Sequence, residues 1–280
     1  MPTRLQKTAK TELTEKPGPH RGVLDLAHAE QNFALRRYYP SSRLVPFIEH
    51  FWIIHWDLRG RPDYTAEVLP HPAVNLAFTR ERGWITGVTT AKYTYHLEGA
   101  GDVLGIQFRP GAFRAFFGRD VHEITDRTLP ATEVFPAADD AFRLALLDRP
   151  TDAEIVADGE ALLSAHRPAP DPGVDLIGRI IAAVRDDREL ASVAVVASRF
   201  GMKQRTLQHL FKTHVGVGLK WIIRRYRLME AAEIAESGTA QNWTAIAHEL
   251  GYSDQAHFTN DFTRIVGRPP TDHARHVARE

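Results

Sequence analysis

The feature that most constrains this sequence is a pattern that occurs twice near the C-terminus, about 50 residues apart. In each copy a helical pattern of apolar residues ends at a glycine, Gly201 in the first and Gly251 in the second. A second helical pattern follows, in which two apolar residues lie four positions apart. These pairs are Leu207 and Phe211, then Phe258 and Phe262. A helix, a glycine-containing turn and a second helix form the helix-turn-helix unit, whose second helix can enter the major groove of DNA. Two units in tandem predict a monomer that contacts two segments of the groove.

The length and composition are those of a globular protein with two domains. The chain has 280 residues, of which 43% are hydrophobic and 25% charged. No stretch approaches the roughly 18 consecutive apolar residues of a membrane span. The N-terminus has Arg4, Lys7 and Lys10 without an apolar segment behind them, so we expect no secretory signal. There is no cysteine, which suits a reducing cytosol and excludes disulfides, cysteine-zinc sites and thiol nucleophiles. We therefore expect a cytoplasmic protein without membrane association.

The charges are distributed unevenly although the formal net charge is zero. Residues 199–229 contain eight basic residues and no acidic one, whereas residues 230–280 contain four basic and eight acidic residues. Attraction to phosphate supplies most of the non-specific affinity of proteins for nucleic acid. The distribution predicts that the first unit and the helix after it provide this attraction. The alternative is that the basic run is a solvated helix face.

Short β-strand patterns dominate the N-terminal half, and helical patterns follow. The strands are expected at residues 51–56, 67–69, 73–78, 84–88, 93–97 and 103–108. Short strands separated by Gly and Pro are typical of a barrel or sandwich. Helices are expected at residues 112–117, 138–147, 153–166, 174–186, 192–200, 204–215, 219–236, 242–250 and 255–266, with a short one after Pro270. The predicted fold class is α+β with two domains: an N-terminal barrel with helices and an all-α C-terminal domain.

A proline-rich segment separates the two domains. Residues 167–173 contain three prolines and a glycine, and proline cannot continue a helix. The expected organisation is a loose tail at 1–21, a regulatory domain at 22–167, a linker at 168–173 and a DNA-binding domain at 174–280. The two helix-turn-helix units are expected at about 192–216 and 242–267.

The outer faces of the second helices carry the residues expected to contact DNA. In the first unit the predicted outer face consists of Arg205, Gln208, His209 and Lys212. Arginine can bind guanine and glutamine can bind adenine through paired hydrogen bonds, whereas Lys212 suits a phosphate. In the second unit Ser253 is the expected N-cap, and the outer face consists of Gln255, Ala256, His257 and Asn260. Asp261 is predicted to repel phosphate, so we expect weaker binding by this unit.

These motifs resemble those of the AraC/XylS family of bacterial regulators. Residues 251–258, Gly-Tyr-Ser-Asp-Gln-Ala-His-Phe, with Phe262, Gly267, Pro269 and Pro270, resemble the family signature. Residues 201–208, with Phe211, Lys212 and Gly216, are similar to the first unit of the family, so the likeness covers about 192–275. It implies seven helices, with a long connecting helix at 219–236. It also implies base contacts from Arg205, Gln208, His209, Ala256, His257 and Asn260. The sequence departs from the family at Lys203, which replaces a small hydroxyl residue, and at Asn260, where a basic residue is frequent.

Phosphate contacts are expected from basic and polar residues around both units. The predicted set is Arg199, Lys203, Lys212, Lys220, Arg224, Arg225, Gln255 and Arg264.

The N-terminal half is similar to the cupin-like β domain that precedes this DNA-binding module in an uncharacterised subgroup of the same family. The likeness rests on Tyr39-Pro40-Ser41, Pro46-Phe47-Ile48-Glu49 with Trp52, Val68-Leu69-Pro70, Asn75-Leu76 and residues 105–111. It implies a sensing or dimerising role. Alternation along residues 51–56 places Phe51, Ile53 and His55 on one face and Trp52, Ile54 and Trp56 on the other. The predicted effector pocket contains Trp52, Ile54, Trp56, Asn75 and Phe108. The alternative is that these aromatic residues fill a core.

The leading functional prediction is a sequence-specific transcription regulator without catalytic residues, cofactor or metal. His50, His55, His71, His96 and His122 lie in the N-terminal half, but no two have the His-x-His spacing of a cupin metal site. The expected partners are double-stranded DNA, a small-molecule effector, RNA polymerase and a second copy of the chain through the N-terminal domain. The alternatives are a cupin-type metal-dependent enzyme with a DNA-binding appendage and an architectural DNA binder. A repair methyltransferase is excluded because the chain has no acceptor cysteine.

Overall fold

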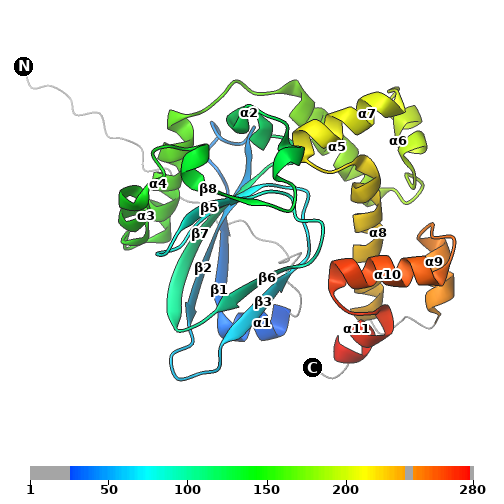
Figure 1. Ribbon diagram of the computed structural model, residues 1–280, viewed down its shortest axis with the longest axis horizontal. Helices are drawn as coiled ribbons and strands as arrows, with labels where there is room; N and C mark the ends of the chain where they lie inside the picture. The colour runs from blue at the N-terminus through cyan, green and yellow to red at the C-terminus, as the bar shows by residue number, and fades with distance from the viewer. Residues whose placement is uncertain (1–25, 237–241, 278–280) are drawn as a thin grey trace, which may run out of the picture.

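The computed structural model describes residues 26–236 and 242–277. These residues form a β-sheet part with flanking helices, followed by a part that is entirely helical (Figure 1). The predicted order along the chain, an α+β part followed by an all-α part, is confirmed. The predicted tail at residues 1–21 lies outside the described residues. No described helix is both long and apolar enough to cross a membrane.

The strands of the N-terminal part form two antiparallel sheets. They are β1 (Ala34–Tyr38), β2 (Ile48–Asp57), β3 (Tyr64–Val68), β4 (Asn75–Phe78), β5 (Gly83–Thr86), β6 (Tyr93–Leu97), β7 (Ala100–Phe108) and β8 (Thr128–Pro130). The larger sheet has the order β1-β2-β7-β4-β5-β8, and the smaller sheet consists of β3 and β6.

The predicted closed barrel does not form. Among the described residues β1 and β8 are the edges of the larger sheet, and neither pairs with β3 or β6. Pro70 and Pro72 lie between β3 and β4, and proline has no N–H to donate to a ladder. The chain passes through this segment from the smaller to the larger sheet without pairing the two, and the N-terminal part is an open sheet structure.

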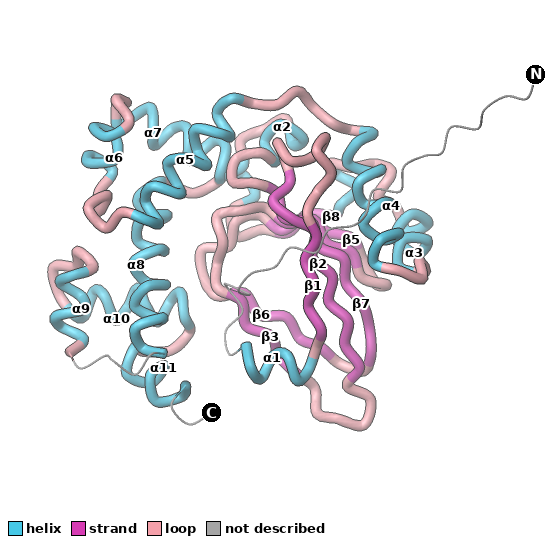
Figure 2. The backbone as a smooth tube through the Cα atoms, turned by 180° about the vertical axis from the view of Figure 1, so that it is seen from behind, coloured by secondary structure: helices cyan, strands magenta, loops and turns pink. Residues whose placement is uncertain are grey.

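The larger sheet has one face packed against helices. Phe51 and Ile53 of β2 are fully buried in the main core, whereas Trp52 lies on the other face, as the alternation predicted. The helical elements here are α1 (Leu26–Asn32), α2 (Phe113–Phe117), η1 (Val121–Ile124), η2 (Ala131–Glu133), α3 (Asp140–Leu147) and α4 (Asp152–Ala165). Figure 2 shows α3 and α4 side by side next to the larger sheet. A Cβ added at Gly159 of α4 would lie 3.4 Å from the Phe51 ring, so this glycine allows α4 to approach the sheet closely.

The helical part begins two residues earlier than expected. Asp171 is the N-cap of the first helix, and its side chain accepts a hydrogen bond from the Gly173 N–H at 2.7 Å. Pro172 and Gly173, predicted as linker, belong to the helix, because proline is well tolerated in the first turn. The helices are α5 (Pro172–Asp186), α6 (Val193–Arg199), α7 (Gln204–Leu210), the π-helical turn η3 (Phe211–Val215), α8 (Leu219–Glu236), α9 (Trp243–Glu249), α10 (Gln255–Val266) and α11 (Pro270–Val277).

Helix α8 connects two separate hydrophobic cores. Leu219 and Ile222 in its first half pack with α5, α6 and α7, whereas Leu228 and Ala231 in its second half pack with α9 and α10. Figures 1 and 2 show the two helix pairs at different heights along α8. A single continuous helix therefore sets the spacing between the two helix-turn-helix units.

Candidate nucleic-acid interface and ligand pocket

The first helix-turn-helix unit consists of α6 and α7. Ser192 caps α6, and Gly201 adopts a φ of 61° in the turn, a conformation that glycine adopts without strain. Leu207 and Phe211 are fully buried, as predicted. Lys203 occupies the N-cap position of α7 and forms no capping hydrogen bond through its side chain, which agrees with the departure seen in the sequence. The predicted contact residues Arg205, Gln208, His209 and Lys212 are all exposed.

The end of α7 differs from the expected continuous helix. Residues Phe211–Val215 form a π-helical turn, closed by a 3.1 Å hydrogen bond from the Gly216 N–H to the Phe211 carbonyl oxygen. The Thr213 hydroxyl donates to the His209 carbonyl at 2.9 Å. The hydroxyl thus competes with the backbone N–H that would donate to this carbonyl in a regular α-helix. Beyond the turn, the Gly216 carbonyl accepts a 2.8 Å hydrogen bond from the Thr125 hydroxyl of the sheet part. The π turn thus lies where the first unit contacts the N-terminal part.

The second unit consists of α9 and α10. The predicted N-cap Ser253 is wrong: Asp254 caps α10 and accepts a 2.7 Å hydrogen bond from the His257 N–H. A carboxylate is a strong acceptor for a helix N-terminus, and the loop here is one residue longer than in the first unit, which brings Asp254 to the capping position. Phe258 and Phe262 are fully buried, as predicted. The predicted contact residues Gln255, Ala256, His257 and Asn260 are exposed.

The predicted phosphate contacts separate into two groups. Most are exposed, namely Arg199, Lys203, Lys212, Lys220, Gln255 and Arg264. The prediction for Arg225 is wrong, because its side chain lies on the buried face of α8 with 2% exposure and donates to the Pro70 carbonyl oxygen. Burial lowers the pKa of Arg225 to about 10. Arg224 is half-buried and pairs with Asp261, so its charge is directed to a carboxylate within the protein.

Asp261, which was predicted to repel phosphate, is buried. It is 7% exposed, and its Oδ2 accepts from the Tyr252 hydroxyl at 3.3 Å. Its carboxylate lies 3.0 Å from Arg224 and 3.4 Å from Arg264. The residue is therefore part of the core of the second unit, and cations of the same protein offset its charge.

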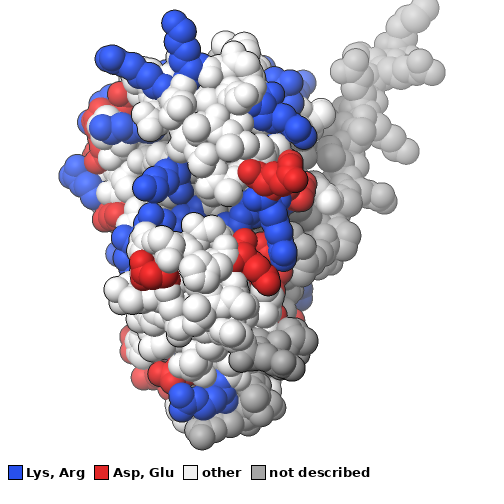
Figure 3. All heavy atoms as spheres, turned by 90° about the vertical axis from the view of Figure 1, so that its right-hand side faces the viewer, with Lys and Arg blue, Asp and Glu red and all other residues white. Residues whose placement is uncertain are grey.

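The basic side chains gather on the first unit. In Figure 3, which faces the side formed by the helical part, Lys and Arg are most frequent in the upper region, where α6 and α7 lie. The lower region, over α9 and α10, is mostly uncharged. The surface thus agrees with the charge distribution in the sequence.

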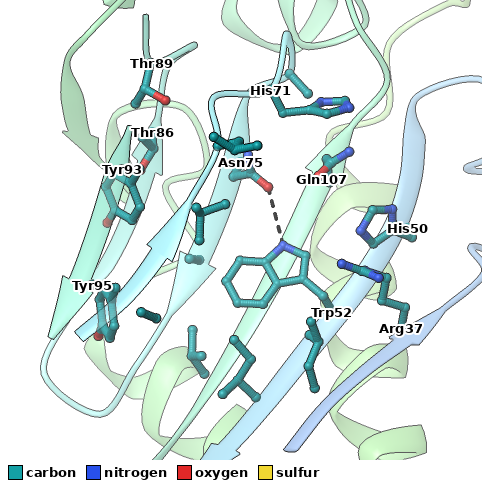
Figure 4. A pocket seen from close by; sticks show the side chains of 18 of the residues that line it. Arg37, His50, Trp52, His71, Asn75, Thr86, Thr89, Tyr93, Tyr95 and Gln107 are labelled. Atoms are coloured by element: carbon teal, nitrogen blue, oxygen red, sulfur yellow. Dashed lines mark hydrogen bonds between the residues drawn. The ribbon is translucent and has the colours of Figure 1, made fainter. Parts of the chain in front are cut away.

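A cavity of about 210 Å³ lies between the larger and the smaller sheet. Figure 4 shows side chains from both sheets directed into it. Of the predicted pocket residues, Trp52, Ile54 and Asn75 line the cavity, and the Trp52 Nε1 donates to the Asn75 Oδ1 at 3.4 Å. The predictions for Phe108 and Trp56 are wrong. Phe108 points to the opposite face, into the main core, because residues alternate along β7, and the Trp56 Nε1 donates to the Glu98 carbonyl at 3.0 Å near the end of the sheet.

The sequence analysis missed the charged residue of this cavity. Arg37 lies on β1, a strand that was not predicted, and its side chain is directed into the cavity (Figure 4). Burial lowers the pKa of Arg37. The sequence contained one signal for this strand, because Leu35 and Arg37 alternate with Ala34 and Arg36. His50, His71 and Gln107 also line the cavity.

The segment between β3 and β4 contacts both the cavity and the helical part. Leu69 and His71 line the cavity. Leu69 also belongs to the core formed by α8, α9 and α10, and the Pro70 carbonyl accepts from Arg225 of α8. Nearby, Glu67 of β3 pairs with Lys92 and lies 3.4 Å from Arg268, which follows α10.

Each of the two parts matches a known protein domain. Residues 36–130 match a domain of unknown function, DUF6597, and residues 196–276 match a helix-turn-helix domain. The chain is 33% identical over 92 residues to a putative AraC-like transcription regulator of Streptomyces lividans, which covers 33% of this chain and 30% of that protein. It is 34% identical over 83 residues to the HTH-type transcriptional activator RhaS of Pectobacterium carotovorum subsp. carotovorum, which covers 30% of this chain and 29% of that protein.

Two solved structures are similar at low identity. The C-terminal domain of AraT, a response regulator from Geobacillus stearothermophilus, has a TM-score of 0.33 and 21% identity, covering 38% of this chain and 86% of that one. ToxT from Vibrio cholerae O395 has a TM-score of 0.39 and 10% identity, covering 88% of this chain and 98% of that one.

The fold defines a two-domain protein whose C-terminal part contains two helix-turn-helix units. Its C-terminal part matches a helix-turn-helix domain and is similar to regions of AraC-like and RhaS regulators, in agreement with the resemblance seen in the sequence. The matched region spans less than a third of the length of these relatives.

Proposed function

We propose that this protein is a sequence-specific DNA-binding transcription regulator whose N-terminal sheet domain binds a small-molecule effector. The observation that carries the proposal is the arrangement of α7 and α10. Both helices bury their apolar anchors against the two halves of α8 and expose polar faces. In this proposal the base-reading residues are Arg205, Gln208 and His209 in the first unit and Ala256, His257 and Asn260 in the second.

The first unit supplies most of the attraction to the DNA backbone. Its exposed cations Arg199, Lys203, Lys212 and Lys220 have the roles of phosphate contacts, and Gln255 and Arg264 add to them in the second unit. The second unit binds with fewer charges and serves mainly to extend the contacted sequence.

The effector acts on DNA binding through the segment 68–71. This segment lines the cavity on one side and packs against α8 on the other, with Leu69 in the core of the second unit. A ligand that moves the segment also moves the Pro70 carbonyl, to which Arg225 of α8 is bound. Because α8 carries both units, this contact supports a change of DNA affinity upon ligand binding.

The location and the remaining partners are those predicted from the sequence. We assign to the protein a cytoplasmic location, a contact with RNA polymerase and a homodimer formed through the sheet domain.

Binding to DNA fragments from upstream of the gene, compared with random fragments of equal length, tests the proposal. At about 150 mM salt a specific site should bind at least about 10³-fold more tightly than random DNA. Equal affinity for both kinds of fragment would contradict sequence-specific regulation. An architectural binder would show no change in DNA affinity with any ligand.

No specific observation favours the metal-dependent enzyme. In the described part of the chain, the acidic and histidine side chains that come close enough together to hold an ion are Asp63, His96 and Glu98. They are exposed and do not line the cavity. Elemental analysis of the purified protein tests this alternative, and a stoichiometric transition metal would support it.

A further inference from the structure

The Trp52 indole lies flat on the larger sheet, with one face against Gly105. The two residues are register partners on β2 and β7, and a Cβ added at Gly105 would meet Cε2, Cζ2 and Cδ2 of the indole at 1.8, 2.0 and 2.5 Å. Because Cε2 and Cδ2 are the carbons shared by the two rings, a face of the indole, and not an edge, covers the glycine. The opposite face is therefore directed away from the sheet, into the cavity that Trp52 lines.

The cavity face of Trp52 is available for stacking. In the described part of the chain no aromatic ring stacks on this indole. Trp84, by contrast, already contacts the Tyr95 ring, with centroids 6.4 Å apart, and the Arg82 guanidinium at 4.4 Å. The Trp52 Nε1 donates to the Asn75 Oδ1 at 3.4 Å, and this bond helps to hold the indole in its orientation (Figure 4). An aromatic ring bound in the cavity can therefore stack on Trp52.

Hydrogen-bonding side chains of the larger sheet lie beyond one edge of the indole. Gln107 follows Gly105 by two residues on β7, so the two lie on the same face of the strand, about 7 Å apart. Gln107 is the register partner of Asn75 on β4, which pairs in turn with Thr86 on β5. All three side chains line the cavity, and Figure 4 shows them above Trp52.

The Gln107 amide is open to a ligand. It makes no hydrogen bond with the residues that the structure describes, whereas the Asn75 Oδ1 already accepts from the indole. A primary amide presents a donor and an acceptor side by side, and glutamine uses this pair to bind the edge of adenine. The amide thus suits a planar molecule that has an N–H next to a carbonyl or a ring nitrogen. Its position lets one molecule stack on Trp52 and pair with Gln107 at the same time.

Most of the remaining lining is apolar. Ile54 and Val103 lie on the other side of the Trp52 row, and Leu97 of β6 lines the wall formed by the smaller sheet. A sugar has hydroxyl groups around its whole ring, and several of them would lose their hydrogen bonds to water against these side chains. A flat aromatic ring with one polar edge matches both kinds of wall. Because the cavity is partly open, its volume does not limit the substituents that extend out of it.

We infer that the cavity binds a planar heteroaromatic molecule whose ring stacks on Trp52 and whose edge, an N–H next to a carbonyl or ring nitrogen, pairs with the Gln107 amide. This inference specifies the effector class and rests on the proposed regulatory function. The sheet supplies the stacking surface, and Gln107 determines which edge of the ring is recognised.

Calorimetric titration of the full chain with matched probes tests this assignment. Carbostyril is a fused aromatic lactam with the required edge, N-methylcarbostyril lacks the N–H, and δ-valerolactam has the edge without an aromatic ring. Carbostyril should bind about tenfold more tightly than N-methylcarbostyril, which leaves the Gln107 oxygen unpaired. It should also bind at least about tenfold more tightly than δ-valerolactam, which cannot stack. Equal binding of carbostyril and its N-methyl derivative, no binding of carbostyril, or tighter binding of glucose overturns the assignment.

Two glutamine substitutions provide a matched control. Gln107→Leu should weaken carbostyril by about tenfold, to the affinity of its N-methyl derivative. Gln31→Leu removes an exposed amide from α1, outside the cavity lining, and should leave the difference between the two probes unchanged. A difference that persists in Gln107→Leu refutes the edge contact. If Gln107→Leu does not fold, the ratio of the two affinities in the unaltered protein still decides.

DNA binding separates the failure of this inference from that of the proposed function. A protein that selects a DNA sequence but does not bind carbostyril refutes this ligand class alone. A protein that binds carbostyril as expected but shows equal affinity for all DNA sequences retains the ligand site and refutes the proposed regulatory function.

Discussion

Arg224 Nη1 of α8 lies 3.0 Å from Asp261 Oδ2 of α10, and this pair joins the connecting helix to the second helix of the second unit. The sequence predicted a phosphate contact for Arg224 and a repulsive charge for Asp261. The contact changes both interpretations, because the cation offsets the carboxylate inside the protein. The second unit therefore has a nearly neutral outer face, on which Ala256, His257 and Asn260 are exposed.

Asp261→Ala should destabilise the protein by about 2–4 kcal/mol. The substitution leaves Arg224 half-buried without its carboxylate and removes the acceptor of the Tyr252 hydroxyl. The free energy of unfolding, measured by urea denaturation, checks this value. Asp272→Ala is the control, because that exposed pair with Arg275 should contribute less than about 1 kcal/mol. Equal effects of the two substitutions would refute a structural role for Asp261.

Arg205→Ala should change sequence preference, whereas Lys212→Ala should weaken binding to all sequences alike. A base contact carries about 1–3 kcal/mol of discrimination, and a phosphate contact contributes about one unit to the salt slope. Selection from a random DNA pool measures the first effect, and titrations at several salt concentrations measure the second. Arg43→Ala, an exposed charge on the sheet part, should change neither. If Lys212→Ala altered the selected sequence, the two roles would have to be exchanged.

The helical part was predictable because its signals are local. Apolar residues at helical spacing and the turn glycines Gly201 and Gly251 identified both units, and the buried anchors lie where the pattern placed them. The π turn was not predictable, because it depends on the Thr213 hydroxyl and on the contact of Gly216 with Thr125, 91 residues away. Local spacing contains no information on such a contact.

The errors in the sheet part arise from long-range pairing. Alternation along β2 placed Trp52 and Ile54 correctly, but an open sheet and a closed barrel contain the same strands and differ only in how their edges pair. Arg225 was misassigned for the same reason, since its acceptor at Pro70 is 155 residues away in the sequence. The sequence of a helix shows how many basic residues it contains, whereas tertiary contacts determine which of them face solvent.

Arg225→Ala should destabilise the protein by about 2–4 kcal/mol and leave the salt slope of DNA binding unchanged. The substitution removes the donor to the Pro70 carbonyl and creates a cavity beside α8. Lys220→Ala, on the same helix but exposed, should lower the salt slope by about one and change stability by less than about 0.5 kcal/mol. Denaturation and salt titration of both variants check these values. A lower slope for Arg225→Ala would restore its predicted phosphate contact.

Gly105→Ala should destabilise the protein by about 1–3 kcal/mol and displace the Trp52 indole. The new methyl group would overlap the ring, which must move into the cavity. Denaturation followed by tryptophan fluorescence measures both effects. Gly178→Ala in α5 is the matched control, because its Cβ would meet only the end of the Arg109 side chain at 3.6 Å. Alanine in a helix should stabilise by about 0.5–1 kcal/mol, so the two substitutions should have opposite signs. Unchanged tryptophan fluorescence and unchanged stability in Gly105→Ala would contradict the close approach of ring and backbone.

Asp152→Asn should destabilise the protein at neutral pH, and the difference from the unaltered protein should shrink in acid. Burial raises the pKa of Asp152, but hydrogen bonds from Tyr38 and His55 and the charge of Arg36 outweigh this, and the pKa is lowered overall. A carboxyl whose pKa is lowered by folding contributes stability above its unfolded pKa of about 3.9 and loses it as the pH falls through the folded value. The difference in the free energy of unfolding should therefore be about 1–3 kcal/mol above about pH 5 and decrease below about pH 4. Urea denaturation across this range measures it, and a difference that stays constant in acid would show that the charge of Asp152 does not matter.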